Sequence, residues 1–360
     1  CLFVFLGHFF VDFCIGDIFP LNTPLYRAGM LLFYGCYTVP LFCAISGFLA
    51  VQKELEKGWQ LVLAAVNRFL RFELPLFFLL AAILFLNRRG LFACGDLLAQ
   101  KLSNKQLAGN YTFESHYTWL FRKPFWDLHL YDNPLWMIGS LFAGNLALYW
   151  YGYASSLCRR HLKGRACTAV RAACMIILFI IARHDIPMLA VLLGGCYGLA
   201  QKRWGREDRS CPAHAKTVPA VGFHNITHIL LMNVWLYFLR DFDFERFPRY
   251  YEWAGLLTAL AILNLAFTVR PLQSVLAAKP LTALSSLSFA VYVVHYPLIG
   301  LLSCPLIYTL WDRIPYVPLV LLSFAATAAA CFLLAFAYNR IIERPCYTVI
   351  RRGIGFLEDN

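Results

Sequence analysis

Long apolar stretches, separated by short polar segments, run along the chain from its first residue to about residue 339. A helix needs about 20 apolar residues to cross the hydrocarbon core of a bilayer. Because the stretches are continuously apolar, they favour helices over the alternating strands of a transmembrane barrel. The pattern predicts an all-α protein, a polytopic transmembrane helix bundle with about ten spans, at residues 1–20, 30–51, 70–87, 134–153, 168–183, 187–201, 222–239, 253–269, 286–304 and 316–339.

The composition agrees with a membrane protein. Of the 360 residues, 60% are hydrophobic and only 14% are charged, whereas soluble domains carry about 25% charged residues. No second soluble domain follows the last span, so we assign residues 1–345 to a single transmembrane domain and residues 346–360 to a short cytoplasmic tail. The chain begins at Cys1 inside an apolar run, which indicates a clipped N-terminus.

The net charge of +12 reflects membrane topology rather than a nucleic-acid partner. Lys and Arg collect in cytoplasmic loops, and about 20 of the 32 basic residues fall on one side if the N-terminus is inside. We therefore expect an integral protein of the cell membrane with both termini in the cytoplasm and with residues 88–133 outside.

Neither metal nor disulfide chemistry is indicated. Most of the 13 cysteines lie inside apolar runs, where Cys packs as a small hydrophobe. His224 and His228 stand four residues apart, but the segment HNITH lacks the glutamate of a zinc-protease motif and no third ligand is evident. We expect no metal and no bound cofactor.

An ionisable pair stands in the first span. His8 lies in the segment FLGHFFVDF, and a titratable residue inside a membrane is costly and usually functional. Asp12 follows one helical turn later on the same face. Its carboxylate can fix the tautomer of an imidazole that acts as a general base. The structural alternative is a buried histidine that hydrogen-bonds a neighbouring helix.

Arg68 and Arg71 stand one turn apart where the third span begins. Guanidinium groups suit phosphate recognition because their donors form a rigid planar fork. The alternative is that both arginines are ordinary anchors at the cytoplasmic membrane surface.

Three further residues can be interpreted either as functional or as structural. His295 lies in SLSFAVYVVHYPLI, followed by Pro297, which bends the helix or frees a carbonyl; hydrogen bonding between helices is its structural alternative. Glu343 in IIERP lies beside Arg344, where a local ion pair is the simple account. Ser46 lacks the G-x-S-x-G sequence of a nucleophile elbow, so we interpret it as a small residue at a helix contact.

The ordered set of segments resembles the acyltransferase-3 family of integral-membrane O-acyltransferases over nearly the whole chain. The segments that carry the resemblance, besides His8 in the first span, are VPLFCAISGFLA, NRFLRFELP, NPLWMIGSLFAGNLALY, PMLAVLLGGCYGLA, SLSFAVYVVHYPLI and IIERP. The resemblance implies transfer of an acyl group, commonly acetyl from acetyl-CoA, to a hydroxyl of a carbohydrate, a glycan or another acceptor.

The resemblance also implies roles for single residues. His8 corresponds to the family's essential histidine, and Trp136 corresponds to the tryptophan of the fourth-span motif. Arg68 and Arg71 correspond to its paired cytoplasmic arginines. His295 and Glu343 correspond to the histidine and the glutamate of the family's late motifs. Two features differ from the family: the arginine that normally precedes the first histidine by about ten residues falls before Cys1, and Leu141 stands where many members have a glutamate.

Two functions from different classes follow from these observations. The first is a membrane O-acyltransferase that uses acyl-CoA as co-substrate and His8 as general base, with Asp12 assisting. The second is a transporter or a glycan or lipid flippase without acyl transfer, which accounts for the spans and buried histidines but not for the ordered motifs. Consumption of acyl-CoA distinguishes the enzyme from the transporter.

We predict that the loops near residues 155–170 and 202–217 face the cytoplasm, because basic residues concentrate there. Single-cysteine variants in each loop, labelled in intact cells with a membrane-impermeant thiol reagent, should react only after the cells are opened. A cysteine placed within residues 88–133 should react from outside. External labelling of the 202–217 loop contradicts the topology.

Overall fold

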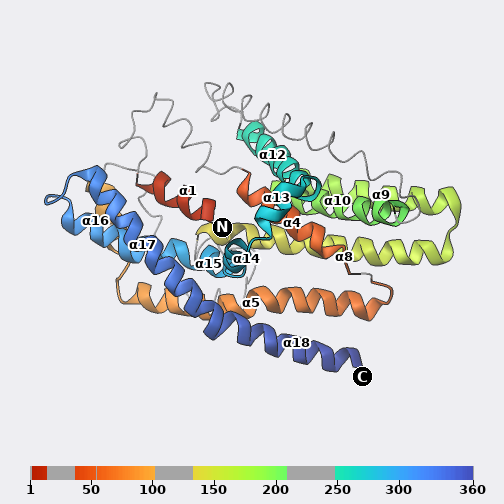
Figure 1. Cartoon of the computed structure of the whole chain (residues 1–360). Helices are drawn as coiled ribbons and strands as arrows, with labels where there is room; N and C mark the ends of the chain where they lie inside the picture. The colour runs from red at the N-terminus through yellow and green to blue at the C-terminus, as the bar shows by residue number, and fades with distance from the viewer. Residues whose placement is uncertain (1, 14–36, 54, 102–132, 209–247, 360) are drawn as a thin grey trace. The chain divides into compact units, whose positions relative to one another are not determined.

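The computed structural model of the chain describes residues 2–13, 37–53, 55–101, 133–208 and 248–359, and Figure 1 shows the course of its helices. In these ranges every regular element is helical. The chain divides into two compact units that alternate along the sequence. The predicted seventh span, residues 222–239, lies outside the described residues.

The first unit comprises residues 1–35, 69–139 and 283–360. Within it, the first helix and the ninth and tenth apolar stretches pack against one another. Its elements are α1 (Leu2–Asp12), most of α5 (Gly58–Arg88), α6 (Cys94–Lys101), the 3₁₀ turn η2 (Asn133–Trp136), α15 (Ser288–Leu298), the π-helix η5 (Ile299–Ser303), α16 (Cys304–Leu310), α17 (Tyr316–Tyr338), the π-helix η6 (Asn339–Glu343) and α18 (Arg344–Asp359).

The second unit comprises residues 36–68 and 140–282. Its elements are α4 (Thr38–Ala50), the start of α5, nearly all of α8 (Met137–His161), α9 (Gly164–Ala182), α10 (Ile186–Asp208), α12 (Pro248–Thr268) and α13 (Arg270–Leu276). The helix α14 (Lys279–Ser285) follows at the border between the units.

The all-α, polytopic membrane prediction is confirmed. Among the described residues, four helices are long and apolar enough to cross a bilayer, at Gly58–Arg88, Gly164–Ala182, Ser288–Leu310 and Tyr316–Leu357. A fifth becomes possible if the bent pair Glu252–Thr268 and Arg270–Leu276 forms one span. The total of about ten spans stays a prediction. Residues 346–359 of the expected tail continue the last helix as α18.

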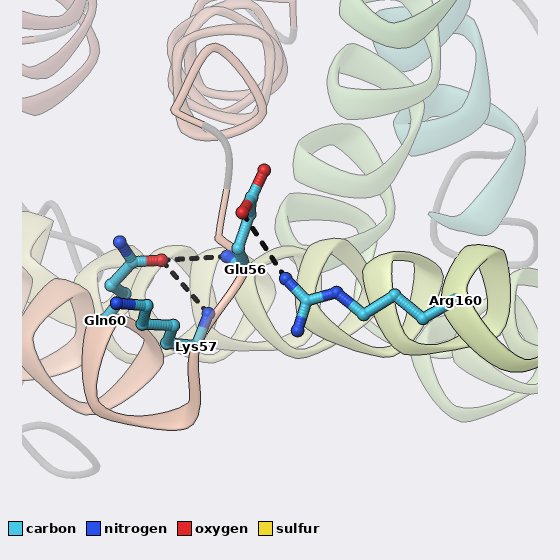
Figure 2. Close-up of polar contacts among 4 residues, drawn as sticks. All are labelled: Glu56, Lys57, Gln60 and Arg160. Atoms are coloured by element: carbon cyan, nitrogen blue, oxygen red, sulfur yellow. Dashed lines mark hydrogen bonds and ion pairs between the residues drawn. The ribbon is translucent and has the colours of Figure 1, made fainter.

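The helix of the third span begins twelve residues before the predicted start at residue 70, at Gly58. Gln60 explains this start, because its Oε1 accepts the backbone N–H groups of Glu56 at 2.8 Å and Lys57 at 3.1 Å (Figure 2). These are donors that a helix N-terminus leaves without helical partners. Arg160, at the end of α8, pairs with Glu56 at 3.3 Å; both side chains are exposed, so this pair contributes about 0–1 kcal/mol.

The end of α5 is equally well specified. Gly90 has φ +71°, the left-handed conformation that glycine adopts without steric cost. Its N–H donates to Asn87 O at 2.9 Å, and the N–H of Leu91 donates to Leu86 O at 3.3 Å. This pair of bonds is the Schellman arrangement that satisfies the last carbonyls of a helix.

The second unit is held by close backbone packing of α4 against α10. A Cβ atom built on Gly194 would lie 2.0 Å from the carbonyl oxygen of Ala44, and one built on Gly47 would lie 1.8 Å from that of Val191. Only glycine permits this approach. Small residues at helix contacts are the usual means by which membrane helices pack, because lipid provides no hydrophobic drive to associate.

We predict that Gly194→Ala destabilises the protein by about 1–3 kcal/mol or more, since the added methyl group meets backbone that cannot rotate away. Gly152→Ala, in α8 of the same unit, is the matched control: nothing lies within 4 Å of its Cβ position. The control should stay within about 1 kcal/mol of the unaltered protein. Thermal unfolding of purified protein in detergent measures both. Equal melting temperatures for the two variants contradict the tight α4–α10 contact.

Candidate functional site

His8 and His295 lie next to each other in the first unit. Their ring centroids are 5.4 Å apart with an interplanar angle of 37°. His8 comes from α1 and His295 from α15, so the pair joins residues almost three hundred positions apart. Tyr296 also contacts His8, edge to face, at 5.1 Å. The structure thus brings together the two histidines that the sequence singled out separately.

Aromatic rings pack around the histidine pair. Phe5 lies edge to face with His295 at 6.0 Å and stacks on Phe324 of α17 at 5.8 Å. Phe9, one turn further along α1, also contacts Phe324, at 5.2 Å. Phe5, Phe9 and His295 are fully buried. The pair therefore lies in an apolar, low-dielectric environment in which electrostatic interactions are strong.

The hydrogen bonds of His295 determine its tautomer. Its Nδ1 lies 2.7 Å from Tyr292 O and 3.2 Å from Val291 O. A carbonyl only accepts hydrogen bonds, so Nδ1 carries the proton and the neutral ring keeps its lone pair on Nε2. Among the described residues, this buried Nε2 has no hydrogen-bond partner. His295 thus offers a fixed, unengaged proton acceptor.

Both late-motif residues occur beside π-helical turns. Such turns are rare insertions that shift side chains around a helix and are frequent at functional sites. The first, η5, starts four residues after His295 and follows Pro297, which has no N–H to continue the ladder. The second, η6, ends at Glu343.

Glu343 is buried and accepts a hydrogen bond from Asn339 Nδ2 at 2.8 Å. The Tyr347 hydroxyl bonds to the same carboxylate. The guanidinium of Arg71, on α5, lies 5.4 Å from the Tyr347 ring centroid. The structure therefore connects two predicted site residues, Arg71 and Glu343, through one tyrosine that sequence reasoning did not consider.

Arg68 belongs to a polar cluster in the second unit. Its Nη2 donates to Ser46 Oγ on α4. Asn145 Nδ2, on α8, donates to the same oxygen at 3.1 Å and to Leu141 O at 2.6 Å. Ser46 and Asn145 are both buried. Ser46 therefore serves as an acceptor at a contact between helices, which is consistent with its interpretation as a packing residue.

The remaining predicted residues differ in their exposure and in whether the structure describes their side chains. Trp136 ends η2, which packs against α15 in the first unit, and its side chain is half exposed, at 49%. Asp12 ends α1, but its side chain lies outside the described residues, as do His224 and His228. Leu141, in place of a carboxylate, is completely buried.

Two polar residues escaped the sequence analysis. Glu73, within the quoted segment NRFLRFELP, has a buried Oε2 with no hydrogen-bond partner among the described residues. Asn145 is fully buried between α8 and α4. Both are polar residues inside apolar segments, and that signal alone is enough to mark them.

The histidine pair suits proton transfer in an apolar environment, and the exposed guanidinium of Arg71 suits contact with an anion. Within the described ranges, no three His, Cys, Asp or Glu side chains gather as a metal ion requires. One imidazole with a fixed tautomer lies beside a second, half-buried imidazole. Such a pair can take a proton from a hydroxyl and return it.

The family model described as an acyltransferase domain, that of the acyltransferase-3 family, matches residues 1–336 of the chain. The match covers most of the 360 residues, so the chain belongs to this family of polytopic membrane acyltransferases. No curated protein and no solved structure matches the chain. Membership decides between the two function classes left open by the sequence, in favour of the enzyme.

Proposed function

From membership of this acyltransferase family, we propose that the protein transfers an acyl group, acetyl in the simplest case, from acyl-CoA to a hydroxyl of a carbohydrate or glycan, with His8 as general base. The observation that carries the proposal is the contact between His8 and His295, with ring centroids 5.4 Å apart. A pair of neutral imidazoles in an apolar environment supplies the proton acceptor that hydroxyl attack requires.

In the proposed reaction, His8 takes the proton of the acceptor hydroxyl as that oxygen bonds to the thioester carbonyl carbon. The carbon–sulfur bond then breaks, and the CoA thiolate leaves and takes the proton from the imidazolium. Proton transfer of this kind contributes about 10²- to 10⁴-fold in rate. Holding both substrates in place contributes up to about 7–11 kcal/mol.

His295 is proposed to support His8 rather than replace it. Its main-chain bonds hold the ring in one orientation, with the Nε2 lone pair available. Two positive charges 5.4 Å apart in an apolar environment would repel strongly, so the pair holds at most one extra proton. His295 therefore stabilises the imidazolium form of the pair as a neutral neighbour. Asp12 is proposed to orient His8 from the next turn of α1.

The two arginines are proposed to hold the donor. Arg71 is exposed beside Tyr347, and its planar fork suits a phosphate of CoA. Arg68 donates to Ser46 and is proposed to add a second positive charge one turn earlier on α5. Glu343 accepts a hydrogen bond from the Tyr347 hydroxyl and so fixes the aromatic ring against which Arg71 lies. Trp136, half exposed, is proposed to contact substrate with its ring.

We predict that His8→Ala abolishes acyl transfer while expression and membrane insertion persist, because the variant loses the base at a position that is only half-buried. Asp12→Asn should reduce turnover without eliminating it. The measurement is product formation from acetyl-CoA, in membranes matched for protein amount. His161→Ala, at the exposed end of α8, is the matched control and should retain full activity. Turnover by His8→Ala at the level of the unaltered protein contradicts the mechanism.

His295→Asn tests the role of the second histidine. The asparagine amide can still donate to Tyr292 O, as Nδ1 does, but no atom replaces Nε2. We expect a loss of about 10-fold or more in kcat, an unchanged KM for acyl-CoA and a normal melting temperature. A loss of folding in His295→Ala, with full activity in His295→Asn, would show that the ring only maintains structure.

We predict that Arg71→Ala raises the KM for acyl-CoA more than it lowers kcat, because the guanidinium contributes to donor binding before and during reaction. Arg71→Lys should restore affinity only in part, since an ammonium lacks the planar fork. Arg68→Ala should act in the same direction but also lower stability, through loss of its bond to Ser46. Arg165→Ala, exposed near the start of α9, is the control. If the double variant Arg68→Ala, Arg71→Ala keeps the original KM for acyl-CoA, the two arginines serve only as anchors at the membrane surface.

A further inference from the structure

Residues 270–285 form a segment without a buried side chain. Its two short helices, α13 and α14, follow α12 in the chain (Figure 1), and no residue of either is buried. Large apolar side chains are nonetheless exposed along both helices, by 40–57%, at Val275, Leu276, Leu281 and Leu284. Exposed apolar side chains grouped in this way mark a contact with a partner or a membrane.

The two helices repeat one short pattern. α13 begins Arg270-Pro271-Leu272, and α14 begins Lys279-Pro280-Leu281. In each, a further apolar residue follows three positions after the leucine, at Val275 and at Leu284. At 100° per residue, the leucine and this residue share one face of the helix, and the basic residue stands on the opposite face. Both helices are therefore amphipathic in the same sense.

The geometry of α13 fits a helix that lies along a membrane surface. α12 is apolar, and the chain turns by 94° between Thr268 and Arg270. The sequence predicts a span over residues 253–269, and a chain that turns through a right angle at the end of that span continues along the plane of the membrane. The turn is built into the structure: Gln273 Nε2 donates to Phe267 O at 2.8 Å, and Thr268 Oγ1 donates to Asn264 O at 2.8 Å. These bonds occupy carbonyls at the end of α12.

The charge of the segment indicates the chemistry of its partner. Arg270 and Lys279 are the charged residues among positions 270–285, and no acidic residue accompanies them. An amphipathic helix with basic residues on its polar face binds in the interface of membranes that contain anionic lipid. A neutral bilayer would bury the apolar face but would offer no net negative charge to the basic residues.

We propose that residues 270–285 form an interfacial segment that binds anionic phospholipid, with Leu272, Val275, Leu276, Leu281 and Leu284 at the acyl-chain boundary and with Arg270 and Lys279 on lipid phosphate. The segment anchors the end of α12 at the membrane surface. No residue of this segment takes part in the proposed acyl-transfer mechanism.

The test uses photo-crosslinking of the full-length chain in lipid nanodiscs. The photoreactive residue p-benzoyl-phenylalanine is placed at position 276 or 284, on the apolar faces, and at position 274 or 282, on the polar faces, as matched controls. After irradiation, intact-protein mass spectrometry identifies each adduct. We expect lipid adducts at 276 and 284 to exceed those at 274 and 282 by about five-fold or more, the ratio that about one kcal/mol of preference produces.

Lipid selectivity is read from nanodiscs that mix phosphatidylcholine with phosphatidylglycerol. The anionic lipid should be enriched among the adducts by about five-fold over its share of the bilayer, and the double variant Arg270→Gln, Lys279→Gln should return it to that share. Adducts to protein at 276 and 284, equal lipid labelling of both faces, or no enrichment of the anionic lipid in the unaltered chain each overturn the proposal. The lipid-crosslinking result and the activity of the His8 variants are independent: a negative crosslinking result does not contradict the proposed acyl transfer, and full activity of His8→Ala does not contradict lipid binding.

Discussion

The absence of water from the bilayer core is the constraint on which this structure depends, because every main-chain N–H and C=O must find its partner inside the protein. Helices meet that demand along their length, and side chains meet it at irregular points. Gln273 Nε2 donates to Phe267 O at 2.8 Å where α12 turns into α13. The buried Tyr338 hydroxyl finds its own partner in Pro75 O, at 2.7 Å, on the continuous helix α5.

The same constraint gives meaning to the polar side chains that remain. His295 Nδ1 donates to main-chain carbonyls, and its Nε2, beside a second histidine, has no hydrogen-bond partner among the described residues. In an apolar environment an unengaged acceptor is costly, which is a reason to expect that it serves the reaction. The first unit therefore holds the proposed proton acceptor, and the Arg71–Tyr347–Glu343 connection as well.

Glycine contacts support the polar cluster of the second unit. Because Gly194 and Gly47 let α4 and α10 meet backbone to backbone, α4 is held where Ser46 can accept from both Asn145 and Arg68. The packing and the hydrogen bonds depend on each other here: weak interhelical polar contacts of about 0.6–2 kcal/mol each persist because close packing fixes their geometry.

The sequence by itself determined the helical membrane class, the family and the identity of most candidate residues, because apolar length and residue order are local properties. It missed the early start of α5, where Gln60 extends the helix, and it passed over Glu73. Only the tertiary structure decided that His8 meets His295, that Arg71 lies by Tyr347, and that Arg68 bonds Ser46. Those pairings join distant segments, and helical periodicity fixes which face a residue occupies but not which helix faces it.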